Sequence, residues 1–334
     1  MEDTILKLLK ASENGKIDRR QLIQALGLTA GAALAASTVP KAAAVFASQT
    51  RVAGGRTFPA ASTINHLSLA VSDYAKSRDF YVDLFGLRVA WDDGKGCAVE
   101  FGDLKSPDGM YIRPVAKPGD KPTVNHISFG IPDFMDHKAA IKAEMERLEL
   151  KNIRPDTEVG WTCDDPAGYL LEPVIVKHEA MFPGALAPCV EAASAKCKEA
   201  AAAGLKNLNG ATKPSGKGFK ATYFSHIILN VPKSEIAKER DFYSGMYGMK
   251  VISDKANGSN PEVVLGFSKN TIYLRPTANP SDKPYCVSYG FVVENYDQAK
   301  AKTELESRGL KPEADGDGWT FSDPDGLRIG IFAA

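Results

Sequence analysis

The sequence predicts an α+β fold in which one βαβββ module occurs four times. The clearest support is an internal repeat: "RDFYVDLFGLRV" at 78–89 recurs as "RDFYSGMYGMKV" at 240–251, which lies 162 residues further along the chain. "YIRPVAKPGDKP" at 111–122 recurs at the same displacement as "YLRPTANPSDKP". A third pair, "GWTCDDPAGYLLE" and "GWTFSDPDGLRIG", closes the two copies. The chain is therefore expected to hold two copies of one unit, over residues 64–176 and 223–334.

Each copy contains two smaller modules, and each module opens with a strand that is followed by a helix. In the first copy, "INHLSLAV" and "VNHISFGI" are rich in the apolar residues typical of strands. "YAKSRDFYVDLFG" and "HKAAIKAEMERLE" follow with apolar residues at helical spacing, and Gly86 stands where the first helix should stop. Further strands are expected in "LRVAWDD", "GCAVEFG", "GMYIRPV", "VGWTCDD" and "YLLEPVIV". The order βαβββ is therefore expected twice in each copy.

The N-terminal segment differs in composition from the rest of the chain. Arg19 and Arg20 precede an uncharged run of Ala, Leu and Gly that is too short and too weakly apolar for a good membrane span. "VFAS" offers small residues for cleavage after Ala47. The segment resembles a twin-arginine export signal, and an amphipathic or buried helix is the alternative. The expected parts outside the two copies are an export signal at 1–47, an N-terminal extension at 48–63 and a partly helical linker at 177–222.

The balance of charges limits the classes of partner. The chain has 41 basic and 41 acidic residues, so it has no basic field of the kind that attracts nucleic acid. We expect no nucleic-acid partner, and no stable membrane anchor after the signal is cleaved. The signal implies an exported protein, periplasmic or extracellular. A homodimer is left open.

Three motifs carry a family resemblance. They are "RDFYxxxxG" at a helix end, a histidine on the opening strands, and "DPxGxxxE" on a closing strand. Together they resemble the vicinal oxygen chelate superfamily, which includes glyoxalases, fosfomycin and bleomycin resistance proteins, and extradiol dioxygenases. The resemblance covers nearly everything from residue 64 onward. It implies tandem vicinal oxygen chelate domains, in which four modules form two cup-shaped half-barrels with metal ligands projecting inward.

Two histidines and a glutamate of the first copy match ligand positions of that superfamily. By strand alternation, His66 and His126 each share a face with small residues, opposite the face that would pack on the helices. Glu172 lies in an apolar strand, where an isolated charge needs a partner. The resemblance makes these three residues the ligands of one divalent metal per chain, with open positions for a substrate that chelates through two oxygens. Fe(II) or Mn(II) suits this donor set best, and Zn(II), Ni(II) and Co(II) are alternatives.

Arg113 is the candidate for a role beside the metal. When "GMYIRPV" is aligned with "GYLLEPV", Arg113 falls where Glu172 falls in the next module. The resemblance implies a fourth ligand, a glutamate, at that position in glyoxalase I proteins, and arginine cannot ligate a metal. We therefore expect Arg113 to bind an anionic substrate or to balance Glu172. The alternative is a surface arginine, and the repeated Arg275 adds weight to a structural role.

The second copy keeps only part of the ligand set. It has His226, but Ser288 and Gly330 stand at the positions of the other two ligands. Pairing the modules in order therefore places the metal in the first copy alone. Some four-module glyoxalases instead pair the second module with the third, which would put His226 in place of His66. The short connector of constant length inside each copy, and the long linker between copies, favour pairing in order.

Three functions are consistent with these features. The preferred one is an exported metal-dependent dioxygenase of the extradiol type, although extradiol enzymes carry a further catalytic histidine and no histidine lies between His137 and His178. The second is a non-redox lyase, isomerase or transferase, glyoxalase-like or fosfomycin-resistance-like, whose metal acts as a Lewis acid. The third is a metal-free small-molecule-binding resistance protein, and the ligand set argues against it.

The export signal can be tested by replacing both arginines with lysine. The double variant Arg19→Lys/Arg20→Lys should accumulate as an uncleaved precursor in the cytoplasm, because the signal depends on paired guanidinium groups and not on positive charge alone. Cell fractionation and immunoblotting would report the precursor and the mature form. Arg51→Lys, beyond the expected cleavage site, is the matched control. Normal maturation of the double variant would contradict the prediction.

Overall fold

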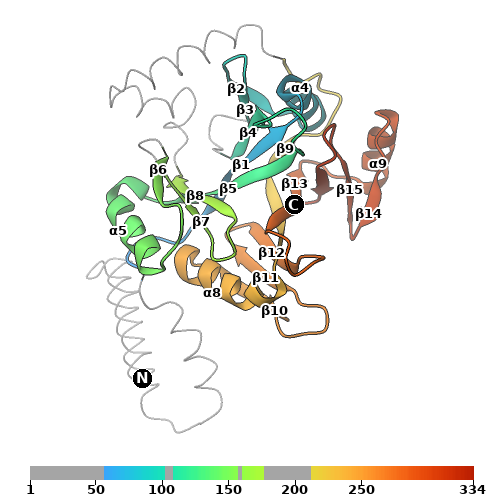
Figure 1. The fold of residues 1–334 in the computed structure, drawn as a ribbon. Helices are drawn as coiled ribbons and strands as arrows, with labels where there is room; N and C mark the ends of the chain where they lie inside the picture. Colours follow the sequence, from blue (N-terminus) through green and yellow to red (C-terminus); the bar gives the residue numbers. More distant parts are fainter. Residues whose placement is uncertain (1–55, 102–107, 157–159, 177–211) are drawn as a thin grey trace, which may run out of the picture. The chain divides into compact units, whose positions relative to one another are not determined.

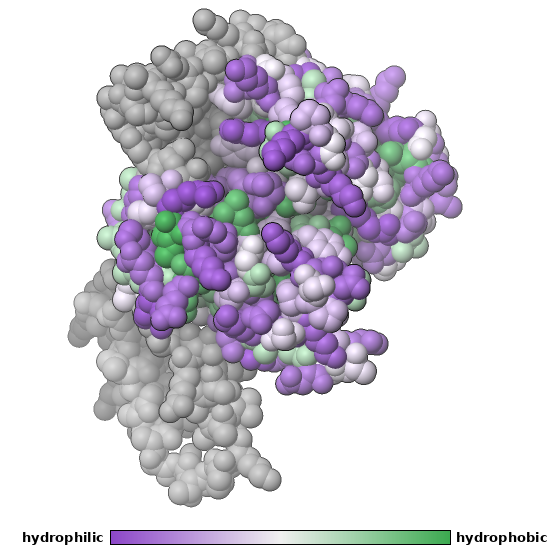
Figure 2. All heavy atoms as spheres, in the orientation of Figure 1, coloured by the Kyte–Doolittle hydropathy of each residue, from purple (hydrophilic) through white to green (hydrophobic). Residues whose placement is uncertain are grey.

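The computed structural model describes residues 56–101, 108–156, 160–176 and 212–334 (Figure 1). The expected export signal lies outside these residues, as does most of the expected linker. None of the described helices is long and apolar enough to cross a membrane. The face of the molecule in Figure 2 is mainly hydrophilic, with small hydrophobic patches between the polar side chains.

Four βαβββ modules follow one another along the chain, as the sequence predicts (Figure 1). The first copy contains β1 (Thr63–Val71), α4 (Tyr74–Phe85), β2 (Arg88–Asp92), β3 (Cys97–Glu100), β4 (Gly109–Pro114), β5 (Thr123–Ile131), α5 (Phe134–Arg147), β6 (Arg154–Asp156), β7 (Gly160–Asp164) and β8 (Leu170–Ile175). The second contains β9 (Ala221–Val231), the 3-10 helix η4 (Lys233–Glu235), α8 (Ile236–Tyr247), β10 (Lys250–Asp254), β11 (Val263–Phe267), β12 (Asn270–Pro276), β13 (Tyr285–Val293), α9 (Gln298–Ser307), β14 (Glu313–Asp315), β15 (Gly318–Ser322) and β16 (Arg328–Phe332).

Each copy folds into one mixed sheet of eight strands, so the predicted α+β fold is confirmed. In the first sheet the strand order is β2-β3-β4-β1-β5-β8-β7-β6, which places the two opening strands together at the centre. These strands, β1 and β5, are antiparallel to each other, and each is parallel to the last strand of its own module. The second sheet repeats the order with β9 and β13 at its centre. The modules therefore pair in order, the first with the second and the third with the fourth.

Local signals in the sequence set the ends of the helices. The carboxylate of Asp73 caps α4 by accepting hydrogen bonds from the backbone N–H groups of Ala75 and Lys76, at 3.0 and 3.1 Å. The helix ends at Gly86, whose φ of 66° lies in the left-handed region that glycine adopts without strain. Gly248 ends α8 in the same way, with φ 69°. The predicted helix stop is therefore confirmed.

The alternation of the opening strands separates the hydrophobic core from the face that carries the candidate ligands. On β1, Leu67 and Leu69 are buried in the core, as the sequence predicts. The opposite face of the first sheet, which carries His66, is called the inner face below. The core itself continues from one copy into the other, because the ring centroids of Phe85 and Phe291 are only 4.2 Å apart. The two sheets therefore share one hydrophobic core.

The repeated motifs bind each other across the two copies. The hydroxyl of Tyr81, in "RDFY" of the first copy, donates to Oδ2 of Asp323, in "DPDG" of the second copy, at 2.6 Å. In the reciprocal contact, the hydroxyl of Tyr243 donates to Oδ2 of Asp165, in "DPAG", at 3.1 Å. Each aspartate also accepts backbone N–H groups of its own turn. Two of the three repeated motifs therefore hold the two copies together.

One of these contacts buries a second carboxyl group. Glu239 on α8 is fully buried, and its Oε1 accepts the backbone N–H of Ala167 at 2.6 Å. Burial, and then the nearby carboxylate of Asp165, raises the pKa of Glu239 to about 10. Burial also raises the pKa of Asp165, to about 6. Of these two neighbouring carboxyl groups, Glu239 has the more strongly raised pKa.

Glu239→Gln should make the stability of the protein less dependent on pH. A carboxyl group with a raised pKa contributes its full stability below its unfolded-state pKa near 4.5, and this contribution is lost as the pH rises toward 10. The amide keeps the shape of the protonated acid and does not ionise. Between pH 6 and 9, the free energy of unfolding should fall less steeply in the variant, by up to about 1.4 kcal/mol per pH unit.

Urea denaturation at several pH values would measure this difference in slope. Glu306→Gln, on the exposed surface of α9, removes a carboxylate of ordinary surroundings and is the control. Parallel stability curves for Glu239→Gln and the parent would contradict the prediction.

Candidate metal centre

Three side chains from three neighbouring strands meet on the inner face of the first sheet. His66 lies on β1, His126 on β5 and Glu172 on β8. Nε2 of His66 is 3.1 Å from Nε2 of His126 and 2.9 Å from Oε2 of Glu172, and Nε2 of His126 is 3.3 Å from the same oxygen. Within the described ranges, this is the one group of His, Cys, Asp and Glu side chains close enough together to hold a metal ion. The structure thus brings together the three residues singled out from the sequence, which we call the triad.

The register of the central strands places the triad on one face. In the β1–β5 ladder, His66 lies opposite Ser128 and Ser68 lies opposite His126, so the two imidazoles face each other diagonally. In the β5–β8 ladder, Ser128 lies beside Glu172. Because successive side chains alternate between faces, a slip of one residue would turn a ligand into the core. The hydrophobic pattern that fixes the register therefore also fixes the site.

An asparagine precedes each histidine of the triad and orients its ring. The β1–β5 ladder shifts register at Asn65 and again at Asn125, and such bulges let two successive side chains lie on one side. The Oδ1 atoms of these asparagines lie 2.9 Å from Nδ1 of His66 and 3.0 Å from Nδ1 of His126. A carboxamide oxygen only accepts, so each Nδ1 carries the hydrogen and each Nε2 presents its lone pair. Sequence reasoning missed these asparagines, although "NH" occurs on both strands.

The donor set of the triad fits a divalent metal. With bonds of about 2.1 Å, two ligand atoms at right angles around a metal are about 3.0 Å apart, which agrees with the distances of 2.9, 3.1 and 3.3 Å. Burial lowers the pKa of His66, and the carboxylate of Glu172 opposes this shift without cancelling it. The neutral imidazole, which is the form that binds a metal, is therefore favoured. The two nitrogens and one oxygen would lie on one side of a bound metal, and its other side would be open to further ligands.

The strand register corrects the position expected for Arg113. On β4, Tyr111 lies beside Ser68, as Glu172 lies beside Ser128 in the next module. Tyr111 and not Arg113 is therefore the residue equivalent to Glu172. The sequence alignment was wrong by two residues because a charged residue followed by proline occurs in both strands. Arg113 remains on the inner face, since it follows Tyr111 by two positions.

Tyr111 forms a wall beside the triad. Its ring packs edge-on against His66, with ring centroids 4.6 Å apart and an interplanar angle of 68°. Behind it, Trp91 and Ala98 form a small apolar cluster that is separate from the main core. This side of the triad is therefore apolar and aromatic. Sequence reasoning did not identify Tyr111; the available signal was its repetition in the second copy as Tyr273.

The second sheet replaces the triad with apolar contacts. Its register places Ser288 and Gly330 at the positions of His126 and Glu172, as predicted. The ring of Phe332 packs 5.0 Å from the ring of His226, and a Cβ atom added to Gly330 would lie 2.6 Å from the Phe332 ring. Phe332 thus occupies the space that a larger residue at 330 would need. Burial lowers the pKa of His226 to about 4, so this imidazole is neutral.

Two other histidines and Trp161 lie away from the triad or outside the described residues. His137 is on α5, and His178 falls outside the residues that the structure describes. Trp161 turns toward α5, because its Nε1–H donates to the backbone oxygen of Lys138 at 3.2 Å. None of these residues therefore joins the candidate site in the described part of the chain.

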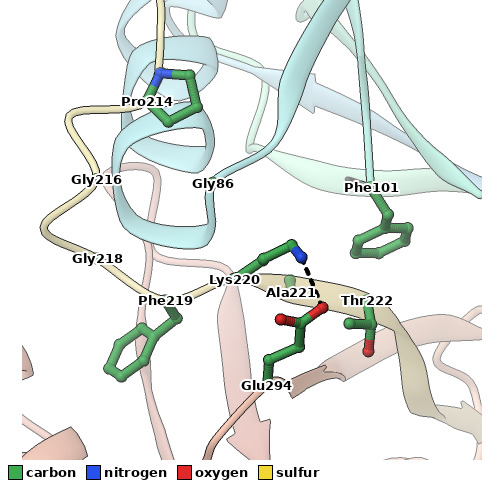
Figure 3. Close-up of a pocket in the computed structure, with 10 residues that line it drawn as sticks. All are labelled: Gly86, Phe101, Pro214, Gly216, Gly218, Phe219, Lys220, Ala221, Thr222 and Glu294. Carbon is green, nitrogen blue, oxygen red and sulfur yellow. Dashed lines mark ion pairs between the residues drawn. The ribbon is translucent and has the colours of Figure 1, made fainter. Parts of the chain in front are cut away.

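A separate cavity of about 660 Å³ lies where the chain enters the second copy (Figure 3). The end of α4 and the segment leading into β9 line it, and Lys220 and Glu294 form an ion pair of 2.8 Å at its wall. Phe101 faces the cavity from the first copy. No triad residue lines this cavity, so it is distinct from the candidate metal centre.

Comparisons with known proteins agree with this fold. Residues 63–173 match the Glyoxalase/Bleomycin resistance protein/Dioxygenase superfamily, and no curated protein matches the chain. The structure is similar to the 2,3-dioxygenase LapB from Pseudomonas sp. KL28, with TM-score 0.62 and 17% identity over 83% of this chain and 94% of that one.

It is also similar to the Mn(II)-bound glyoxalase from Novosphingobium aromaticivorans (TM-score 0.59, 15% identity, 81% and 82% covered). An extradiol ring-cleaving dioxygenase from B. fuscum has TM-score 0.57 and 16% identity over 84% of this chain and 74% of that one. These likenesses show the fold of tandem vicinal oxygen chelate domains, and the family match shows that residues 63–173 form a domain of that superfamily.

The assignment of the site to the first sheet predicts different effects of two histidine substitutions. His66→Ala should abolish metal binding, whereas His226→Ala should leave it nearly unchanged, because His226 lies in the other sheet against Phe332. The parent should bind one metal ion per chain. Elemental analysis after metal loading and dialysis would measure this, with circular dichroism as a check on folding. The reverse pattern would move the site to His226.

Asn125→Ala should weaken metal affinity about 10- to 100-fold. Asn125 is exposed, so its removal should not unfold the protein, but His126 would lose the acceptor that holds its Nδ1–H. Competition with a chelator would measure the affinity. Ser225→Ala removes the matching residue before His226 and is the control. Equal affinities of the two variants would contradict a role for Asn125.

Proposed function

We propose that the protein is a divalent-metal-dependent enzyme whose substrate chelates the metal through two vicinal oxygens, and that its reaction is of the dioxygenase type. The observation that carries this proposal is the triad: two imidazole nitrogens and a carboxylate oxygen, mutually 2.9 to 3.3 Å apart, on one side of a site. His66, His126 and Glu172 would hold the metal. Fe(II) or Mn(II) is preferred, because two imidazoles and a carboxylate with open positions are typical of non-haem iron oxygenases.

A bound Fe(II) or Mn(II) would supply Lewis acidity toward the substrate oxygens and redox capacity toward dioxygen. The chain itself supplies position and environment. Asn65 and Asn125 hold the two imidazoles in the tautomer that presents Nε2. Tyr111 excludes water from the side of His66, which strengthens electrostatic interactions at the site.

A non-redox lyase, isomerase or transferase is the second candidate, and one observation favours it. Extradiol enzymes were expected to carry a further catalytic histidine ahead of the "DPxG" turn. In the described part of the chain, the other two histidines are His137 on α5 and His226 in the second sheet. Neither belongs to the triad. A reaction that needs only Lewis-acid stabilisation of an enolate or alkoxide does not require that further catalytic histidine.

The bound metal and the use of oxygen distinguish the two candidates. The protein would be purified with its own signal, its metal content determined, and oxygen uptake measured with a panel of catechols. Iron or manganese together with catechol-dependent oxygen uptake would support the dioxygenase. Tightly bound zinc or nickel without uptake would contradict it and favour the lyase or isomerase. Glu172→Gln is the control variant, since it should lose metal and activity together while keeping the fold.

A further inference from the structure

Arg113 lies on the inner face near the triad. It follows Tyr111 by two positions on β4, so its side chain leaves the strand on the side that carries His66. In the β1–β4 ladder Arg113 lies beside Ala70, which follows His66 by four residues on β1. The residue is exposed, so a molecule bound on the inner face could reach its guanidinium group.

The two copies of the repeat use this arginine differently. In the second copy, Nε of Arg275 lies 2.8 Å from Oε2 of Glu262, so its charge is neutralised within the protein. The ladders place Cys97 opposite Ile112 and Val263 opposite Leu274, which makes the preceding residues, Gly96 and Glu262, equivalent.

The glycine at position 96 lies directly against the arginine. A Cβ atom added to Gly96 would lie 3.0 Å from Cγ of Arg113, so a side chain at this position would contact the arginine as Glu262 contacts Arg275. Within the part of the chain that the structure describes, no carboxylate lies within ion-pair distance of Arg113. Among the described residues, the copy that carries the triad is therefore the copy in which the arginine has no carboxylate within ion-pair distance.

A purely structural role would not account for this difference. If the arginine served only packing or surface charge, a carboxylate beside it would stabilise either copy equally, and both copies would be expected to have one. In the described ranges, the carboxylate partner is present in the copy without the triad, and no carboxylate takes that place in the copy with the triad. Guanidinium groups bind carboxylates in a planar, charge-assisted geometry, and Glu262 shows that this arginine position can do so.

We propose that Arg113 binds an anionic group of the substrate, so that the substrate class is aromatic vicinal diols that carry a carboxylate. This inference rests on the proposed function, because it places the two vicinal oxygens at the triad. Tyr111, backed by Trp91 and Ala98, lies between the triad and Arg113 along β4 and offers an apolar surface for a planar ring. The substrate would thus be held at two ends and along one flat side.

Binding of matched probes to the metal-loaded protein tests the proposal without turnover. Under anaerobic conditions, calorimetry would compare 3,4-dihydroxybenzoate with 4-methylcatechol, which has a methyl group in place of the carboxylate. The parent should prefer the benzoate by about tenfold or more, which corresponds to one charge-assisted contact. Arg113→Gln should lose this preference and keep its affinity for 4-methylcatechol. Arg275→Gln, in the second copy, should behave like the parent.

A second pair of variants introduces a side chain at position 96, beside Arg113, and leaves Arg113 itself unchanged. Gly96→Glu gives Arg113 the carboxylate that Arg275 has and should reduce the preference for the benzoate. Gly96→Gln has the same shape and the same contacts but no charge, so it should keep the preference. The comparison of these two variants isolates the charge from any steric effect of a side chain at position 96.

The outcomes separate this inference from the proposed function. Chelation of 4-methylcatechol without any preference for the benzoate would overturn the role of Arg113 and leave the metal site standing. The same would follow if Arg113→Gln kept the parent preference. Failure of both probes to bind the metal-loaded protein would overturn the proposed function, and with it the inference that rests on it.

Discussion

The antiparallel pairing of β1 with β5 is the interaction on which the candidate site depends. It joins the first two modules into one sheet and places His66 and His126 in diagonal positions on one face. Neither module has a complete ligand set, because each contributes one histidine and only the second adds Glu172. The buried Leu67 and Leu69 on the opposite face make a slip of register costly, since a shift by one residue would expose them and bury the imidazoles. Packing and chemistry therefore use the two faces of the same strand.

The two copies show how one scaffold supports two kinds of inner face. In the first copy a glutamate completes a polar triad, and Gly96 stands beside Arg113 where the second copy has a carboxylate. In the second copy, glycine replaces the glutamate, Phe332 fills the space, and Glu262 neutralises the arginine. The strand order is the same in both sheets, so the difference arises from a few side chains at equivalent positions.

The residues that hold the two copies together are distinct from the residues of the triad. Tyr81 and Tyr243 reach the buried aspartates of the opposite copy, and these bonds involve two of the three repeated motifs. The third repeated motif, at 111–122, includes Tyr111, which packs against His66. Glu239 adds a second buried carboxyl group with a raised pKa to the contact between Tyr243 and Asp165, so this contact contributes to the pH dependence of stability.

The sequence by itself determined the four modules, their element types, the faces of the opening strands and the three members of the triad. The modules, the element types and the strand faces rest on local periodicity and on the repeat, which a chain shows without folding, whereas the three members of the triad rest on the resemblance to the superfamily. Only the tertiary structure decided that Tyr111 is equivalent to Glu172, that Asn65 and Asn125 support the imidazoles, and that Gly96 faces Arg113. These facts depend on ladder register, bulges and neighbouring strands. A two-residue offset between strands keeps every side chain on the same face, so no pattern of alternation in the sequence could have revealed it.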